Sequence, residues 1–182
     1  MIDYSLYVIL DRNLQGSRSS LQIIEEIIPG GASIIQLREK NLSTKAYFES
    51  ALVICKRIKQ AGIPFIINDR VDIALAVGAD GVHLGDEDLP LSQARAIAPH
   101  LIIGYSADSV EKAIQAEKEG ADYLGVGSVF PTKTKADAGS PIGIEQLRKI
   151  KRAVSIPVVA IGGITLENLS EVLNTGVDGV AV

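Results

Sequence analysis

The sequence predicts a (β/α)8 barrel, the TIM-barrel fold, formed as a single domain over residues 1–182 and lacking the final helix after strand eight. Eight short runs are almost continuously apolar, which is typical of parallel strands that are covered on both faces. Amphipathic segments with helical spacing lie between them. A related phrase (GGAS, GADG, GADY, GVDG) precedes every second run and indicates a repeat of two strand–helix units.

In chain order, the expected strands are SLYVIL from residue 5, SIIQL from 33, PFIIN from 64, GVHLG from 81, LIIGYS from 101, YLGVGSVF from 123, IPVVAIGG from 156 and GVAV from 179. The expected helices are STKAYFESALVICKRIKQAG, DIALAVGA, LSQARAIAP, SVEKAIQAEKEGA, GIEQLRKIKRAV and TLENLSEVLNTG. The longest has a cap at Ser43 and stops at Gly62. An open doubly wound sheet is the alternative, and the lack of a G-x-G-x-x-G motif after the first strand weighs against it.

Composition narrows the classes of function. The net charge of −4 argues against a broad nucleic-acid surface. No apolar run approaches the roughly 20 residues that span a bilayer, and acids stand where a signal peptide would be basic, so we expect a cytoplasmic protein without a membrane partner. One cysteine, Cys55, and two histidines, His83 and His100, leave little material for a disulfide, a zinc site or a Ser-His-Asp triad. We expect Cys55 to be a buried residue without a chemical role.

Basic and amide side chains follow the second strand. Gln36, Arg38 and Lys40 share one face of an extended segment, and two neighbouring cations there suit an anionic ligand. The alternative is a solvated strand end, in which Arg38 and Lys40 pair with Glu39 and Asp11. Both interpretations remain open from the sequence.

Acids follow the third and fourth strands, in the segments NDR (Asn68, Asp69, Arg70) and GDED (Gly85 to Asp88). Neighbouring strands of a barrel bring such carboxylates together, where they can share Mg²⁺ with substrate phosphates. The alternative is that Glu87 and Asp88 complement the dipole of a helix that starts near Pro90.

Three further segments at the same end suit anions. Ser106 follows the fifth strand, PTKTK (Thr132, Lys133, Thr134, Lys135) follows the sixth, and the paired Gly162 and Gly163 follow the seventh, before a helix expected near Leu166. A solvated loop and an ordinary tight turn are the alternatives for the last two segments. Taken together, the six segments indicate a metal-assisted enzyme that binds two phosphorylated groups.

The motifs QLREK, NDRVDIALAVGADGVHLGDEDLP, GYSADSVEKA, GADYLGVGSVFPTKTKADA and VVAIGGIT resemble those of the thiamine phosphate synthase family over nearly the whole chain. The resemblance implies a transferase that joins 4-amino-2-methyl-5-hydroxymethylpyrimidine diphosphate to hydroxyethylthiazole phosphate, with Mg²⁺ as cofactor. Thiamine phosphate and pyrophosphate are the products, formed by a dissociative displacement that needs no protein nucleophile.

The resemblance also implies roles for individual residues. The pyrimidine diphosphate would contact Gln36, Arg38, Lys40, Asn68, Ser106 and Lys135, of which Arg38, Lys40, Ser106 and Lys135 would be catalytic. Asp69 and Asp88 would hold the metal. The thiazole phosphate would contact Thr132, Thr134 and Gly163.

Three departures from the family pattern stand out. Asp86 replaces a frequent Gln and adds a carboxylate beside the expected metal site, and Asp108 replaces a common His. The chain also ends at Val182, within the eighth run, where the family continues. We therefore expect either a truncated chain or a partner subunit, such as a second copy, that covers the exposed wall.

Two other functions remain as alternatives. A thiazole tautomerase on the same barrel uses a histidine at the position of Asp108 and lacks the full PTKTK pattern, so both features favour the synthase. A non-catalytic protein that binds phosphorylated ligands is the third hypothesis. Release of pyrophosphate from the two substrates would separate it from the synthase.

Overall fold

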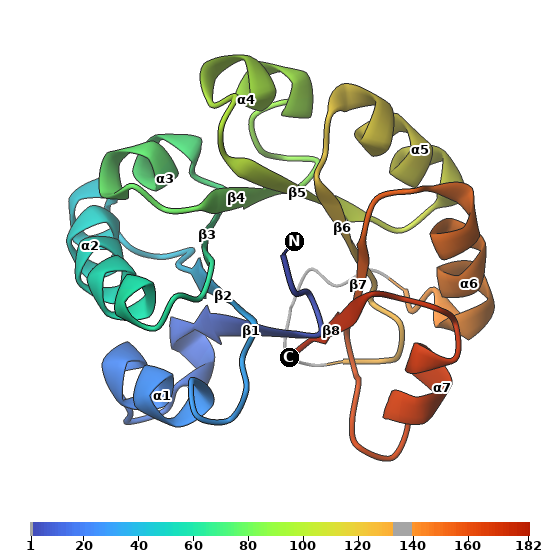
Figure 1. Ribbon diagram of the computed structural model, residues 1–182, viewed down its shortest axis with the longest axis horizontal. Coiled ribbons are helices and arrows are strands. Elements are labelled where there is room, and N and C mark those ends of the chain that lie inside the picture. The colour runs from blue at the N-terminus through green and yellow to red at the C-terminus, as the bar shows by residue number, and fades with distance from the viewer. Residues whose placement is uncertain (1, 133–139) are drawn as a thin grey trace.

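The computed structural model describes residues 2–132 and 140–182. Within them, eight parallel strands close into a barrel in chain order, with β8 paired to β1 (Figure 1). The strands are β1 Leu6–Asp11, β2 Ile34–Arg38, β3 Phe65–Asn68, β4 Gly81–Leu84, β5 Ile102–Ala107, β6 Tyr123–Val126, β7 Val158–Ile161 and β8 Gly179–Ala181. This confirms the predicted fold class and all eight expected strands.

Helices surround the strands in Figure 1, and no helix follows β8 in the described part of the chain. They are α1 Ser20–Ile27, α2 Thr44–Gln60, α3 Val71–Val77, α4 Leu91–Ile97, α5 Val110–Glu119, α6 Gly143–Ala153 and α7 Leu169–Leu173, with a 3-10 turn η1 at Arg12–Leu14. Six of these helices match expected segments. The sequence reading missed α1, although Ser19 and Gln22 form a capping box that marks its start.

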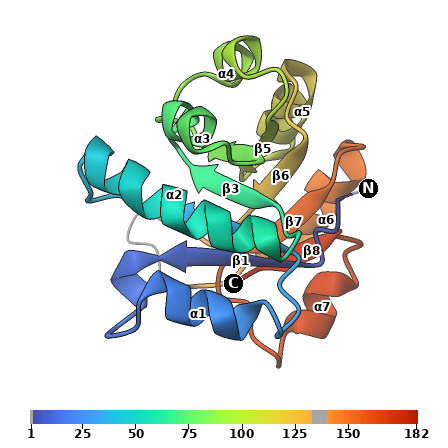
Figure 2. The same cartoon turned by 60° about the vertical axis from the view of Figure 1, so that its left-hand side comes forward.

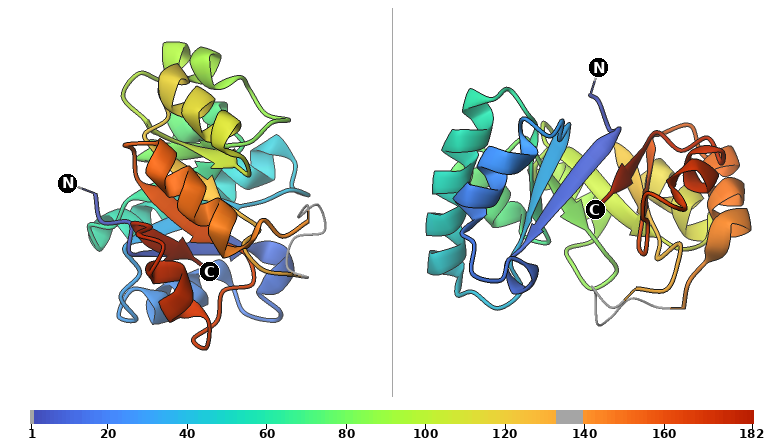
Figure 3. Two further views of the ribbon diagram at one scale, coloured as in Figure 1. Left: turned by 90° about the vertical axis from the view of Figure 1, so that its right-hand side faces the viewer. Right: turned by 90° about the horizontal axis from the view of Figure 1, so that it is seen from below.

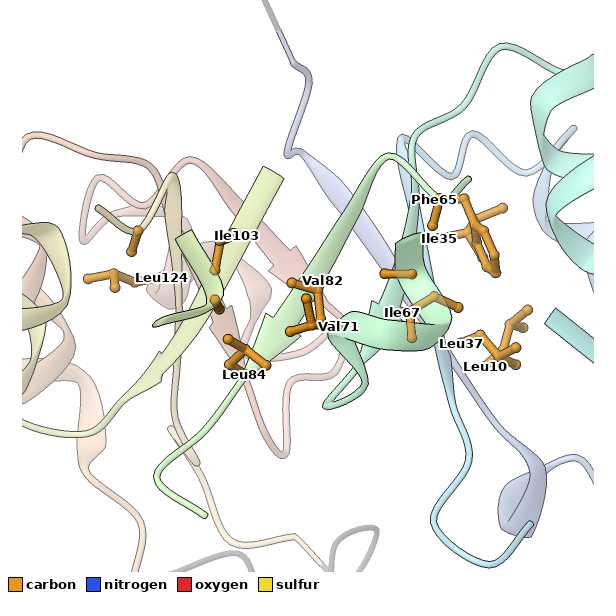
Figure 4. Close-up of a cluster of buried hydrophobic side chains, with 14 of the residues drawn as sticks. Leu10, Ile35, Leu37, Phe65, Ile67, Val71, Val82, Leu84, Ile103 and Leu124 are labelled. Carbon is orange, nitrogen blue, oxygen red and sulfur yellow. The ribbon is translucent and has the colours of Figure 1, made fainter. Parts of the chain in front are cut away.

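The core lies in two layers. Outward-facing strand residues pack against the helices, and Figure 4 shows buried side chains of this layer, among them Leu37 and Phe65 from strands and Val71 from α3. Inward-facing residues fill the barrel itself and form a smaller cluster of Tyr4, Tyr7, Ile34, Ile66, Tyr123, Val159 and Ala181. The alternation of the strands therefore separates a structural layer from an interior that carries hydroxyl groups.

The repeated phrase before every second strand has a structural explanation. In each copy one side chain accepts a hydrogen bond from a backbone N–H at or next to the start of the preceding strand. This side chain is the final Ser of GGAS and the Asp of the other three copies. The four donor and acceptor pairs are Leu6 to Ser33 Oγ at 2.9 Å, Phe65 to Asp80 Oδ2 at 2.8 Å, Ile103 to Asp122 Oδ2 at 2.7 Å and Val158 to Asp178 Oδ2 at 2.7 Å. The predicted repeat of two strand–helix units is thus a repeat of side-chain caps at the amino-terminal end of the barrel.

The strands run in one direction, so their carboxyl ends meet at one rim. In Figure 2 the arrowheads of β1 and β3 point the same way, and in the right-hand view of Figure 3 the N-terminal segment projects from the opposite end. No described helix is both long and apolar enough to cross a membrane. Cys55 is buried, as the sequence predicts, and this burial raises the pKa of its thiol.

Candidate active site at the carboxyl ends of the strands

Ion pairs connect the ends of β1, β2 and β3. Arg38 at the end of β2 pairs with Asp11 at the end of β1, and Lys40 pairs with Asp69, which follows β3. The Arg38–Asp11 pair is one that the alternative interpretation expected, whereas Lys40 pairs with an acid of the expected metal site. Both cations retain solvent access, with side-chain exposures of 17% and 43%, so an incoming anion can reach them.

Asp69 has a backbone conformation that few residue types adopt readily. Its φ is +65°, in the left-handed region where Asp and Asn are tolerated better than other side chains. Its N–H donates to the carbonyl of His83 at 2.8 Å, which fixes the residue against β4. The carboxylate is therefore directed by a constrained turn and does not sit on a free loop.

Asp69 and Asp88 come together, as the sequence predicts for acids after neighbouring strands. Their carboxyl groups are in hydrogen-bonding contact. Burial, opposed by a hydrogen bond from the Gly85 N–H and reinforced by the charge of Asp69, raises the pKa of Asp88 to about 6. Burial and a neighbouring carboxylate both disfavour the charged form of Asp88.

This pair fits a divalent cation. Mg²⁺ is commonly held by one or two carboxylates together with substrate phosphates, and a cation between Asp69 and Asp88 would relieve their repulsion. No group of three or more His, Cys, Asp or Glu side chains converges within residues 2–132 and 140–182. The donor set therefore suits a hard cation shared with a phosphorylated substrate better than a metal held entirely by the protein.

Ser106 lies next to Asp88 and connects it to polar side chains in the barrel interior. A Cβ added at Gly85 would lie 3.6 Å from Asp88 Oδ2 and 4.0 Å from Ser106 Oγ, so both side chains border this glycine. Ser106 Oγ is 3.0 Å from His83 Nε2, and His83 Nδ1 is 3.0 Å from the Tyr123 hydroxyl. Asn68 is buried at the end of β3, and Gln36 is buried inside β2.

His83 and its tyrosine partner were not among the predicted site residues. In the sequence His83 stands within a strand between Val82 and Leu84, where a histidine resembles an ordinary core residue. A signal existed in Gly125 of β6, two strands away from β4 in the barrel. A Cβ at Gly125 would lie 2.9 Å from His83 Cε1, so the chain keeps space for the imidazole.

The loops after β6 and β7 pack closely on each other. Phe130 N–H donates to the Gly162 carbonyl at 3.0 Å, and a Cβ at Gly163 would lie 2.7 Å from the carbonyl oxygen of Pro131. Gly162 and Gly163 both have positive φ, at +100° and +64°. The two glycines therefore allow backbone contact between the loops, beside the half-buried Thr132. Thr134, Lys133 and Lys135 lie outside the described residues.

The helix after β7 corrects one expectation. It begins at Leu169 and not near Leu166, because the Asn168 side chain accepts a hydrogen bond from Thr165 N–H at 2.8 Å and donates to the Gly163 carbonyl at 2.9 Å. These bonds keep residues 166–168 in a turn before the helix begins. The Thr165 N–H is thereby committed within the protein and is not presented by a helix terminus.

Two residues that depart from the family pattern share one partner. Lys112 in α5 contacts Asp86 at 2.7 Å and Asp108 at 3.1 Å, and the Tyr105 hydroxyl donates to Asp86 at 3.1 Å. The extra carboxylate of Asp86 is therefore engaged with α5. The two departures form one surface ion-pair group between the loops after β4 and β5.

A cavity of about 580 Å³ opens at the other end of the barrel, among Tyr4, Arg95, Asp122 and Asp178. Arg95, Asp122 and Asp178 in its lining are already paired. Arg95 donates to Asp122 and to backbone carbonyls, and Lys151 pairs with Asp178 at 2.5 Å. This cavity therefore offers hydrogen-bonding groups that serve the fold, whereas the acids and cations at the carboxyl ends of the strands remain the candidate site.

Known proteins resemble this chain over nearly its whole length. The family model described as thiamine monophosphate synthase matches residues 6–182. A thiamine-phosphate synthase from Chloroflexus aurantiacus is 49% identical over all 182 residues, which cover 84% of that protein, and one from Pyrococcus horikoshii is 55% identical over 97% of this chain and 84% of its own. A solved structure of a thiamine phosphate pyrophosphorylase from Pyrococcus furiosus has a TM-score of 0.91 at 51% identity, with 100% of this chain and 86% of that chain covered. The chain belongs to the thiamine monophosphate synthase family of enzymes.

Proposed function

We propose that the enzyme condenses 4-amino-2-methyl-5-hydroxymethylpyrimidine diphosphate with hydroxyethylthiazole phosphate to give thiamine phosphate and pyrophosphate. The observation that carries this proposal is the rim at the ends of β2, β3 and β4. There the acids Asp69 and Asp88 approach each other beside the cations Arg38 and Lys40. A diphosphate with its metal needs both kinds of group within one site.

The cations have a role in stabilising the leaving group. Arg38 and Lys40 are held by Asp11 and Asp69 before substrate arrives, so their positions are set by the protein. Charge that develops on the departing diphosphate is stabilised most by groups that need not reorganise. Lys135 is proposed for the same leaving group and lies outside the described residues.

Asp69 and Asp88 would hold Mg²⁺. When bound, the ion would neutralise charge on the diphosphate oxygens and orient them. The carboxylate of Asp69 is directed by its left-handed backbone conformation and balanced by Lys40, while Asp88 is fixed by the Gly85 N–H at 2.8 Å. These contacts preorganise the two acids.

The remaining site residues would position two substrates. Gln36, Asn68 and Ser106 border the interior of the barrel and would contact the pyrimidine diphosphate. Thr132 and Gly163, with Thr134, would contact the thiazole phosphate. A dissociative displacement needs no protein nucleophile, and it gains most from correct placement and exclusion of water. We also place the reaction in the cytoplasm, and this location stays a prediction.

The direct test mixes both substrates with Mg²⁺ and measures pyrophosphate and thiamine phosphate. We expect both products in equal amounts, and loss of both when the metal is chelated. Asp69→Asn should remove most of the Mg²⁺-dependent turnover, because it removes a charged ligand while Asn keeps the left-handed backbone conformation.

Asp72→Asn is the matched control. Asp72 pairs with Arg70 in the first turn of α3, and the substitution makes the same chemical change close to the site. Substrate binding without any pyrophosphate from the unaltered protein would favour a binding protein instead. Full activity of Asp69→Asn at the same Mg²⁺ dependence would remove Asp69 from the metal site.

A further inference from the structure

Five polar side chains from five strands form a continuous chain of hydrogen bonds across the barrel interior. In order, Gln36 Nε2 donates to the Tyr7 hydroxyl at 2.8 Å, the Tyr7 and Tyr123 hydroxyls are 2.8 Å apart, Tyr123 is 3.0 Å from His83 Nδ1, and His83 Nε2 is 3.0 Å from Ser106 Oγ. The chain joins β2, β1, β6, β4 and β5. Both of its ends, Gln36 and Ser106, are residues proposed to contact the pyrimidine diphosphate.

The interior is shaped to hold this chain. Tyr7, Tyr123 and Gln36 are only 2%, 1% and 3% exposed, and burial is the main cause that raises the pKa of both phenols. A Cβ at Gly104 would lie 2.1 Å from Tyr123 Cζ. The neighbouring strand therefore omits a side chain where the phenol lies, just as Gly125 does for the imidazole.

The direction of each hydrogen bond follows from the first. The NH₂ group of Gln36 can only donate, so the Tyr7 oxygen accepts. The Tyr123 oxygen, 2.8 Å away, is then within reach as the acceptor for the Tyr7 proton, and this is the direction that we infer. The Tyr123 proton is then directed to His83 Nδ1, which must be the acceptor nitrogen of a neutral imidazole.

The other imidazole nitrogen of His83, Nε2, then carries the proton and donates to Ser106 Oγ. The hydroxyl proton of Ser106 is left to donate elsewhere. In the opposite direction, which would require the amide oxygen of Gln36 to face Tyr7, every bond would reverse, and Ser106 would donate back to His83 and could only accept from a ligand.

We infer that Tyr7 and Tyr123 are positioning residues whose hydroxyls transmit one hydrogen-bond direction from Gln36 to His83, so that Ser106 presents its proton to the diphosphate substrate. The same direction leaves the amide oxygen of Gln36 as an acceptor for an N–H group of the aminopyrimidine. The pair thus sets the donor and acceptor pattern at both ends of one substrate. This inference rests on the proposed function for the identity of the substrate.

The tautomer of His83 is the first measurement, and it is made on the free protein. The chain has only two histidines, so a ¹⁵N-histidine label gives two imidazoles, and His100→Gln assigns them. At about pH 9, well above the usual pKa of histidine, the inference requires His83 to carry its proton on Nε2. In Tyr123→Phe, Nδ1 loses its donor, and the signal should move toward the other tautomer or a mixture.

Kinetics provide the second measurement. Tyr7→Phe and Tyr123→Phe should each lower kcat/KM for the pyrimidine diphosphate by roughly five- to tenfold, about the value of one buried hydrogen bond, and leave KM for the thiazole phosphate unchanged. The double variant should lose no more than either single variant, because one break already interrupts the chain. Tyr4→Phe is the control, since its ring packs 5.2 Å from Tyr123 within the same cluster.

The outcomes separate clearly. An Nδ1–H tautomer or an imidazolium in the unaltered protein would overturn the inference, as would an unchanged tautomer in Tyr123→Phe. Equal losses in Tyr4→Phe, or additive losses in the double variant, would reduce the tyrosines to packing residues. If the unaltered protein released no pyrophosphate, the proposed function would fail while the tautomer would still decide the hydrogen-bond direction.

Discussion

Aspartates stand at both ends of the barrel, but those at the amino-terminal end accept backbone hydrogen bonds, whereas two at the carboxyl end face each other. Asp80, Asp122 and Asp178 each accept from the first or second residue of a strand, and a cation supports the last two. Asp69 and Asp88 instead face each other, and burial together with the charge of Asp69 raises the pKa of Asp88. Identical side chains therefore stabilise the fold at one end and keep charge available for a ligand at the other.

Asp88→Asn gives the largest expected effect and tests the carboxyl end. It should lower turnover on the order of 100-fold, equivalent to about 2.7 kcal/mol, because one of the two proposed charged metal ligands is lost. The Asn oxygen can still accept from the Gly85 N–H, and repulsion with Asp69 disappears, so the thermal midpoint should not fall. Turnover and calorimetry on the same preparation check this, and a lowered midpoint with normal turnover would contradict it.

Gly104→Ala tests the interior that lies between the two ends. The added methyl group would meet the Tyr123 ring at 2.1 Å, and such overpacking typically costs about 1–3 kcal/mol. Denaturant unfolding measures the loss. Gly16→Ala is unsuitable as a control because its φ is +62°, whereas Gly85→Ala meets no atom closer than 3.6 Å. Equal stability of Gly104→Ala and the unaltered chain would mean that the tyrosine can move freely.

Asp122→Asn repeats the chemical change of Asp88→Asn at the amino-terminal end. Here the charged partner of Arg95 is lost, while an oxygen remains for the Ile103 N–H. We expect a loss of about 1 kcal/mol and a fall of the midpoint by about 2–4 °C. The value of kcat should stay unchanged. A kinetic defect as large as that of Asp88→Asn would show that the two ends are not separate in function.

Lys112→Met gives the smallest expected effect. It removes the cation shared by Asp86 and Asp108, but the group is largely exposed, and such pairs contribute about 0–1 kcal/mol. Stability should fall by no more than this and should lose its dependence on added salt at this site. A large change in Mg²⁺ affinity would instead connect Asp86 to the metal site.

The sequence was sufficient where structure depends on local pattern. Apolar runs located all eight strands, and the order of strands then placed Arg38, Lys40, Asp69 and Asp88 at one rim. Local chemistry also explains what was missed at α1, where the Ser19 capping box was present but not used. The predicted start of α7 was wrong because the Asn168 side chain extends the turn before the helix.

The interior chain could not be predicted by the same means. Tyr7 and Tyr123 lie 116 residues apart, and each stands in an apolar run where a phenol resembles any other core ring. Their meeting depends on the closure of the barrel and on the absence of side chains at Gly104 and Gly125. No periodicity within a single strand carries that information.

The side-chain caps have a consequence for how the molecule opens. Each cap connects the start of an even-numbered strand to the backbone N–H of the first or second residue of the odd-numbered strand before it. The capping residues are Ser33, Asp80, Asp122 and Asp178. Separating the two strands of such a unit breaks a cap, whereas separating two units does not. The caps thus group the strands into four pairs, and we expect slow amide exchange at Leu6, Phe65, Ile103 and Val158 to report each pair as one cooperative element.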